Sequence, residues 1–344
     1  MQTELLPVNE TALARAGELI RAGALVAFPT ETVYGLGANA LDADAVGRIF
    51  AAKGRPGDNP LIVHISALDQ LPPLIATEPS PAARALMAAC WPGPMTLIFP
   101  KSPAVPTAVT AGLSTVAVRY PSHPAARALI DAARRPIAAP SANRSGRPSP
   151  TTAAHVLEDM DGRIPLILDG GPCEVGLEST VIDVTGDTPR VLRPGGVTPE
   201  RIAEICGSVA VDDAVLRPLK AGERPRSPGM KYRHYAPTGA LTIVRGDPDA
   251  VIGKISRLYD DALEEGKHPL ILALEGHIPA YGARRALSLG PDAAAMAHIM
   301  FARLRDADAL DADAIFSEAT DTTGVGLAVM NRLERAAGFH VVEA

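Results

Sequence analysis

The 344-residue sequence is poor in cysteine, in aromatic residues and in long hydrophobic runs. Its three cysteines, Cys90, Cys173 and Cys206, are widely spaced and form no C-x-x-C pair, so neither a zinc site nor a disulfide framework is indicated. Aromatic residues make up 4% of the chain, which leaves little material for stacking nucleic-acid bases. The formal net charge of −6 argues against a protein that mainly grips a polyanion, although it allows a local basic groove.

Signals for membranes and export are also lacking. No run of 18 or more apolar residues occurs, so we expect no membrane-spanning helix. The first ten residues, MQTELLPVNE, contain no basic stretch followed by an apolar core, and they do not resemble a signal peptide. These absences predict a cytoplasmic protein.

Several catalytic motifs are missing as well. The sequence has no G-x-x-x-x-G-K-[ST] loop, so any nucleotide is held without a P-loop. It has no G-x-S-x-G elbow for a serine nucleophile and no H-E-x-x-H metal motif. We therefore expect no metal site built from protein side chains.

Short apolar runs alternate with amphipathic segments through the first 200 residues. This alternation predicts an α/β fold. The expected strands are 24–28, 61–65, 97–99, 116–118, 137–139, 166–168 and 181–184. The expected helices are 10–23, 43–53, 80–89, 123–133 and 151–160.

The composition changes near residue 207, which predicts a second domain. Residues 217–237 contain four prolines and two glycines among many basic residues, a composition typical of an extended linker. The α/β alternation then restarts. We predict a catalytic domain at 1–206, a linker at 207–238 and a small Rossmann-like α/β domain at 239–344. The later elements are strands 240–245, 269–274 and 313–317 and helices 248–265, 291–305 and 325–337.

Reactive side chains recur where the apolar runs end, which is where α/β sheets place ligands. Residues 29–37 supply two hydroxyls, a carboxylate and two glycines. Lys53 and Arg55 lie in a Gly/Pro-rich loop; they would suit a triphosphate, and a solvated surface loop is the alternative. His64 lies in a buried run, where it is either a hydrogen-bonded core residue or a functional one.

Arg119 closes the apolar run 116–118 and therefore needs a partner, because an unpaired buried charge is costly. A bound carboxylate would serve, and so would an internal acidic residue. Residues 141–146 could cradle a phosphate or form an ordinary Asn/Ser/Gly turn. Cations and hydroxyls with few general acids or bases favour a reaction driven by positioning and charge neutralisation, such as nucleotidyl transfer.

One competing motif lies at Gly35–Ala40, which matches the loose G-x-G-x-x-A dinucleotide fingerprint. That fingerprint also requires a strand ending in an acidic residue about 20 positions later. A Gly/Pro-rich loop stands there instead, so a nicotinamide oxidoreductase is the weakest reading.

Seven ordered segments between residues 29 and 196 resemble the threonylcarbamoyl-AMP synthase family, of the YrdC type in its longer two-domain form. They are PTETVYGLG, KGRPGDNPLIVHI, WPGPMTLIF, STVAVRYPSHP, APSANRSGRPSPTTAAHV, LESTVIDV and VLRPGG. Further on, SPGMKYRHYAP resembles the linker of the long form, and GVGLAVMNRLERAA resembles the last helix of its accessory domain. The resemblance thus covers nearly the whole chain.

The resemblance implies a YrdC-like twisted, mostly parallel sheet around a central, positively lined cavity. It implies catalytic roles for Lys53, Arg55 and Arg119. It implies an L-threonine site made of Thr32, His64, Arg119 and Ser179. It implies an ATP site made of Lys53, Arg55, Asn59, Thr115, Ser141, Asn143, Ser149, Arg193 and Tyr235.

The resemblance also implies a reaction. Threonine, bicarbonate or carbon dioxide, and ATP would yield threonylcarbamoyl-AMP and pyrophosphate, with Mg²⁺ carried by the triphosphate. A downstream tRNA threonylcarbamoyl transferase complex would use the product, and the basic segment 220–235 is a candidate lid or a solvated tether. An RNA-binding module of related fold is the main alternative. A carbamoyl transferase within a larger maturation enzyme is another, but this chain has no room for its additional domains.

Overall fold

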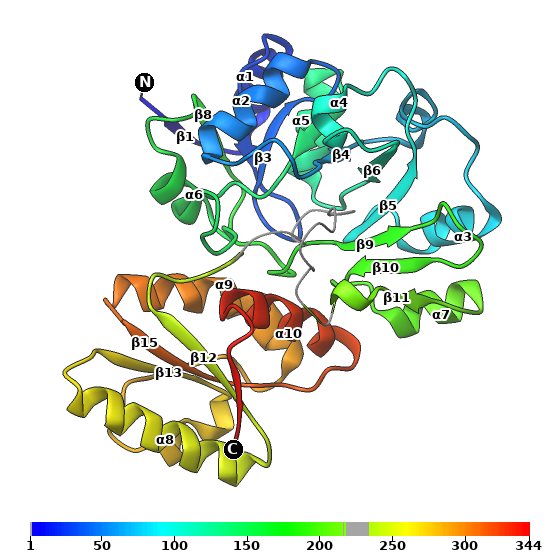
Figure 1. Ribbon diagram of the computed structural model, residues 1–344. Coiled ribbons are helices and arrows are strands. Elements are labelled where there is room, and N and C mark those ends of the chain that lie inside the picture. Colours follow the sequence, from blue (N-terminus) through cyan, green and yellow to red (C-terminus); the bar gives the residue numbers. More distant parts are fainter. Residues whose placement is uncertain (1, 216, 218–233) are drawn as a thin grey trace. The chain divides into compact units, whose positions relative to one another are not determined.

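The computed structural model describes residues 2–215, 217 and 234–344, which form two compact units (Figure 1). The first unit comprises residues 2–145, 149–215 and 217, and the second comprises 146–148 and 234–344. The candidate lid at 220–235 lies outside the described residues apart from His234 and Tyr235. No helix in the described ranges is long and apolar enough to cross a membrane.

An eleven-stranded sheet forms the centre of the first unit. Its strands are β1 Glu4–Pro7, β2 Val26–Phe28, β3 Gly35–Asn39, β4 Ile62–His64, β5 Met95–Pro100, β6 Thr115–Arg119, β7 Ile137–Ala139, β8 Leu166–Asp169, β9 Thr180–Asp183, β10 Arg190–Arg193 and β11 Ala210–Val211. They are ordered β1-β8-β2-β3-β7-β4-β6-β5-β9-β10-β11. Parallel and antiparallel pairs both occur, so the strand ends of this sheet do not all point the same way.

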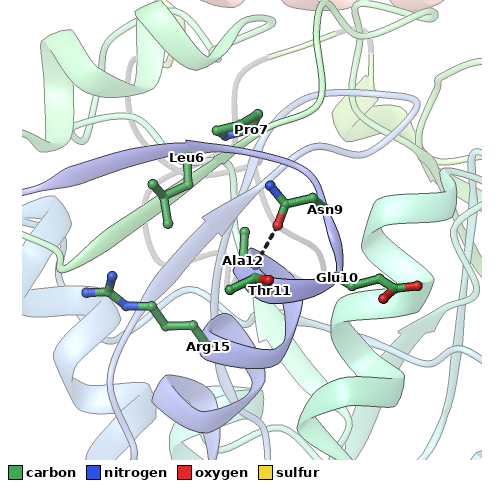
Figure 2. A pocket seen from close by; sticks show the side chains of 7 residues that line it. All are labelled: Leu6, Pro7, Asn9, Glu10, Thr11, Ala12 and Arg15. Atoms are coloured by element: carbon green, nitrogen blue, oxygen red, sulfur yellow. Dashed lines mark hydrogen bonds between the residues drawn. The ribbon is translucent and has the colours of Figure 1, made fainter.

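Helices flank this sheet. They are α1 Glu10–Arg21, α2 Ala43–Lys53, α3 Pro81–Cys90, α4 Thr107–Thr110, α5 Pro124–Ala133, α6 Ala153–Met160 and α7 Pro199–Cys206, with short 3₁₀ turns at Leu68–Gln70, Pro72–Leu74 and Asp213–Val215. Polar N-cap residues define where several of them begin. Figure 2 shows one case, in which Asn9 Oδ1 accepts a hydrogen bond from the Ala12 amide at 2.9 Å.

A five-stranded parallel sheet forms the centre of the second unit. Its strands are β12 Ala240–Arg245, β13 Pro269–Ala273, β14 Ala286–Ser288, β15 Ala314–Glu318 and β16 Val341–Glu343, in the order β14-β13-β15-β12-β16. Helix α8 Pro248–Glu264 covers one face, and α9 Ala293–Ala309 and α10 Gly324–Ala336 cover the other (Figure 1). A 3₁₀ segment, Glu275–Tyr281, follows β13.

The predicted α/β class is confirmed. Over both sheets, nine of the fourteen strand pairs that the described residues form are parallel. The sequence pattern missed short strands that pair at sheet edges, namely β1, β11, β14 and β16. Strand β11 pairs with β10, so the first sheet extends past residue 206. The domain boundaries at 206 and 238 stay a prediction.

The glycines of the Gly35–Ala40 segment have a structural role. They lie in β3, inside the sheet, and not in a phosphate-binding loop. A Cβ built on Gly37 would lie 2.9 Å from the Phe28 ring and 2.8 Å from Ile137. These glycines make room for Phe28, so the match to a dinucleotide fingerprint has a packing cause.

Gly17 lies where α1 packs against α5. A Cβ there would lie 2.6 Å from the backbone carbon of Ala132, closer than real contacts allow. Gly47 in α2 is also helical, but nothing lies within 4 Å of its Cβ position. The two glycines therefore form a matched pair, one needed for packing and one not.

We predict opposite effects of alanine at these two positions. Gly17→Ala should lower the free energy of unfolding by about 1–3 kcal/mol, because the helices must move apart. Gly47→Ala should raise it by about 0.5–1 kcal/mol, because alanine favours helix. Urea denaturation followed through the fluorescence of the sole tryptophan, Trp91, which lies in the first unit, measures both. Equal shifts in both variants would contradict the packing role of Gly17.

Candidate functional site

Two candidate residues are neighbours at the ends of two parallel strands. His64 ends β4 and Arg119 ends β6, and the two residues are register partners. Both are 4% exposed. The strands therefore bring together residues 55 positions apart in the sequence, at the kind of sheet edge where α/β proteins bind ligands.

The buried Arg119 guanidinium contacts the loop that follows β2. Its Nη1 donates a hydrogen bond to Thr32 Oγ1 at 2.9 Å, and its Nη2 lies 2.7 Å from Glu31 Oε1. Thr32 Oγ1 is in turn 2.9 Å from Thr30 Oγ1. The structure thus brings together three predicted site residues, His64, Arg119 and Thr32, and it supplies the internal acidic partner that the sequence left open.

Glu31 is ionised in this setting. Burial opposes its negative charge, but the charge and hydrogen bonding of Arg119, with the amides of Glu31 and Ser122, hold the pKa of this carboxyl below its usual value. The side chains of both partners are 4% exposed. A buried pair of this kind costs desolvation on both sides, so each charge depends on the other.

His64 is neutral. Burial and the nearby positive charge of Arg119 lower the pKa of its imidazole to about 3. Its Nδ1 lies 3.2 Å from the Ile62 carbonyl oxygen and 3.3 Å from that of Ile137, so Nδ1 carries the proton and donates. In this tautomer Nε2 is a hydrogen-bond acceptor, which could receive a hydroxyl or an amine proton from a ligand.

Ser179 joins this cluster through β5. Its Oγ lies 2.8 Å from Thr96 Oγ1, and Thr96 is the register partner of Arg119 across β5 and β6. Arg193 closes β10 and donates to the Ser179 carbonyl through Nε at 3.1 Å and Nη2 at 3.0 Å. The predicted residues Ser179 and Arg193 therefore share one buried network.

Lys53 supports the loop after β7. Its Nζ donates to the carbonyl oxygens of Ser141 at 2.6 Å and Asn143 at 2.5 Å, and lies 3.3 Å from Asn143 Oδ1. It is 4% exposed. Ser141 Oγ also contacts Asn143 Oδ1. Through these hydrogen bonds Lys53 holds that loop in place. A contact between Lys53 and phosphate stays a prediction.

Three further predicted residues, Arg55, Asn59 and Ser149, lie in the first unit. Arg55 donates through Nη2 to the Asn59 carbonyl oxygen at 3.1 Å. The Asn59 side-chain amide is buried, and neither its nitrogen nor its oxygen has a hydrogen-bond partner, which is a costly state unless a ligand or water meets it. Ser149 Oγ donates to Glu178 Oε1 at 2.6 Å.

Thr115 and Tyr235 belong to other parts of the chain. Thr115 begins β6, so its Cα lies roughly 13 Å from that of Arg119 at the usual rise of a strand. Tyr235 belongs to the second unit, where its ring packs on Phe301 at 5.1 Å and lies 5.9 Å from the Arg332 guanidinium. Their assignment to an ATP site stays a prediction.

A small apolar strip lies between Thr115 and Arg119 on one face of the sheet. Side chains alternate along a strand, so Ala117 shares the face of both residues. Ala117 packs into a buried cluster that is separate from the main core and consists of Ile62, Ile98, Ala117, Val181 and Leu192. The face therefore offers an apolar surface with polar groups at both ends.

The sequence reasoning missed Glu31, Thr96 and Glu178 as site residues. The signal for Glu31 was its position after a buried strand, together with the need of Arg119 for a partner. Thr96 lies inside an apolar strand and gave no signal.

The predicted central cavity stays a prediction, and the surface hollow of about 490 Å³ in Figure 2 contains none of the predicted residues. Among the described residues, no group of three or more His, Cys, Asp or Glu side chains could hold a metal ion.

The buried, neutral His64 should make folding sensitive to acid. Its folded pKa of about 3 lies below the ordinary value of 6.5, so only the unfolded chain takes up a proton between these values. Stability is then lost as the pH falls below 6.5, by up to about 1.4 kcal/mol per pH unit. Urea denaturation between pH 7 and 5 should give a shallower slope for His64→Gln, with the exposed His268→Gln as control. An unchanged slope in His64→Gln would contradict this assignment.

Removing Arg119 should leave the buried Glu31 carboxylate without its ion-pair partner. We expect Arg119→Ala to lower the free energy of unfolding of the first unit by about 3–5 kcal/mol, because a buried charge loses its partner. The double variant Glu31→Gln with Arg119→Ala should regain part of this loss. Trp91 fluorescence in urea measures both variants. If the double variant is no more stable than Arg119→Ala, the two residues are not energetically coupled.

Comparison with known proteins identifies the family. Residues 18–195 match the family model described as telomere recombination (Sua5/YciO/YrdC), and residues 197–338 match the threonylcarbamoyl-AMP synthase C-terminal domain. The threonylcarbamoyl-AMP synthase of Pyrococcus abyssi is 48% identical over 98% of this chain and 97% of its own length. That of Bacillus subtilis is 48% identical over 99% of this chain and 97% of its own.

A solved structure agrees over the same extent. The crystal structure of P. abyssi Sua5 complexed with L-threonine has a TM-score of 0.95 and 47% identity, covering 99% of this chain and 100% of that one. Both domain families are matched in order, and the curated relatives align from end to end. The chain therefore belongs to the threonylcarbamoyl-AMP synthase family.

Proposed function

We propose that this protein condenses L-threonine, bicarbonate or carbon dioxide, and ATP into threonylcarbamoyl-AMP and pyrophosphate. The observation that carries the proposal is the buried cluster of Arg119, Thr32 and His64, in a chain that aligns end to end with threonylcarbamoyl-AMP synthases. A cation, a hydroxyl and a neutral imidazole acceptor match the carboxylate, amine and hydroxyl of threonine. The relative solved with L-threonine supports this choice of substrate.

Each group in the cluster has a chemical role. Arg119 would bind the threonine carboxylate, since its Nε has no hydrogen-bond partner within the protein. His64 Nε2 and Thr32 Oγ1 could accept protons from the substrate hydroxyl or amine. Ser179, held by Thr96, would complete the site. Because these side chains are buried and tied to strands, they are already in place before a ligand arrives.

The ATP site is proposed along the apolar strip. Adenine would lie against the face that carries Ala117 and Ile62, near Thr115. The phosphates would extend toward the cations Arg55 and Arg193. Further polar contacts would come from the side-chain amide of Asn59, which has no hydrogen-bond partner, and from the loops that carry Ser141, Asn143 and Ser149. Tyr235 is also proposed to contact the nucleotide. Mg²⁺ would be held mainly by the phosphates of ATP, as this ion usually is in nucleotide sites.

The proposed chemistry is a sequence of two bond formations. With carbon dioxide, the threonine nitrogen bonds to the carbon and loses a proton, which gives a carbamate. With bicarbonate, the same N–C bond forms while the C–OH bond breaks and water leaves, which gives the same carbamate. A carbamate oxygen then bonds to the α-phosphorus of ATP, and pyrophosphate leaves. Fixed cations stabilise the negative charge that develops on phosphate, which is the kind of catalysis that positioning and electrostatics can supply.

The product is an activated donor, so its consumer is proposed to be a tRNA threonylcarbamoyl transferase complex in the cytoplasm. Direct tRNA binding by this chain is a separate question. An RNA-binding module is the competing function, and the net charge of −6 with 4% aromatic residues weighs against it.

The decisive measurement is pyrophosphate release from ATP with threonine and bicarbonate each present or omitted. We expect release only when both are present. Arg55→Ala should reduce kcat/KM by about 100-fold, because one cation that stabilises phosphate charge is lost. The exposed Arg135→Ala is the matched control. Release that is indifferent to threonine, or salt-sensitive RNA binding without turnover, would show that the proposed function is wrong.

A further inference from the structure

The Glu31 carboxylate has no role in the proposed reaction, yet it lies inside the threonine cluster. It is 3% exposed and held ionised beside Arg119. Burying a charge pair is costly, and an internal pair is often no more stable than an apolar replacement. A stabilising role is therefore a weak explanation for a carboxylate at this position.

The ion pair leaves hydrogen-bonding capacity on both partners. Glu31 Oε1 and Arg119 Nη2 form an ion pair at 2.7 Å. Arg119 and the amides of Glu31 and Ser122 lie close enough to stabilise the Glu31 charge, but none makes a well-formed hydrogen bond to either carboxylate oxygen, and Arg119 Nε and Nη2 donate no well-formed bond. Both groups are nearly out of reach of water, which could otherwise satisfy them. The buried carboxylate of Glu31 can still accept hydrogen bonds, and the adjacent guanidinium of Arg119 can still donate them. The pair is therefore complementary to a ligand that carries one positive and one negative group.

Charge balance points to the same ligand. If the substrate carboxylate took over Arg119, Glu31 would be left buried without its cation, at a large cost. An ammonium group on the same ligand removes that cost, since it can replace the guanidinium as the partner of Glu31. Other groups that interact with the charge of Glu31 are His64, which is neutral, His123, whose pKa burial lowers, and Cys173, whose thiol burial keeps uncharged. None of them would supply the missing positive charge.

We propose that Glu31 binds the α-ammonium group of the amino-acid substrate while Arg119 binds its carboxylate, so that the site accepts zwitterionic α-amino acids and rejects simple carboxylates. The inference rests on the proposed function, in that L-threonine is taken as the ligand. Glu31 is on this view a specificity-determining residue.

The test pairs a protein substitution with a ligand substitution. Calorimetric titration measures the Kd of L-threonine and of (R)-3-hydroxybutanoate, which lacks only the amine, for the full-length wild type and for Glu31→Gln. We expect Glu31→Gln to weaken L-threonine binding by about 10–100-fold, the usual effect of losing a charged hydrogen bond. Binding of (R)-3-hydroxybutanoate should stay the same or tighten, because a like charge is removed. Glu174→Gln, which alters an exposed carboxylate next to Cys173 and near His123, should change neither.

Each other result has a definite meaning. Equal weakening of both ligands by Glu31→Gln would show that the residue only holds Arg119, and would overturn the proposal. Unchanged L-threonine binding would overturn it too, while leaving the proposed function intact. Wild type that binds no L-threonine at all would overturn both. If Glu31→Gln fails to fold, the wild type alone decides, since similar affinities for the two ligands contradict recognition of the ammonium.

Discussion

The buried ion pair between Arg119 and Glu31 is the constraint on which the site depends. Arg119 is fixed by the end of β6, by Thr32 and by Glu31, so its guanidinium has one orientation. Burial, aided by the positive charge of Arg119, lowers the pKa of His64, and the same charge lowers the pKa of Glu31 against the effect of burial. One cation at a strand end thus favours the neutral form of one neighbour and the ionised form of the other.

Strand pairing in the sheet places the other side chains of the cluster around Arg119. Parallel pairing of β4 and β6 places His64 next to Arg119, and antiparallel pairing of β5 places Thr96 on the other side, where it contacts Ser179. Each contact comes from a strand or a loop that is fixed at a strand end. Preorganisation of this kind matters most in a reaction whose catalysis is mainly positioning, because little reorganisation is left to be done when the substrates bind.

The sequence predicted the alternation of strands and helices and the positions where strands end. Both depend on local features, namely apolar runs and the polar residues that follow them. It could not predict that Gly35 and Gly37 pack against Phe28, since that depends on which strand pairs with β2. Nor could it predict that Lys53 turns inward to the loop after β7. Glu31 was visible beside Thr32, but choosing between an internal partner and a ligand for Arg119 required the geometry. Family resemblance predicted the site residues, and pairing across the sheet explains which of them lie in contact.

Two buried cations in this unit are held in different ways, and the difference suggests different tasks. Arg119 faces a full negative charge on Glu31, so its field is largely confined to the cluster. Lys53 donates to the backbone carbonyls of Ser141 and Asn143 and contacts the Asn143 side-chain oxygen, so it fixes the conformation of the loop after β7. Under the proposed function, Lys53 would therefore act through the position of that loop, whereas Arg119 would act on a ligand that enters its own ion pair.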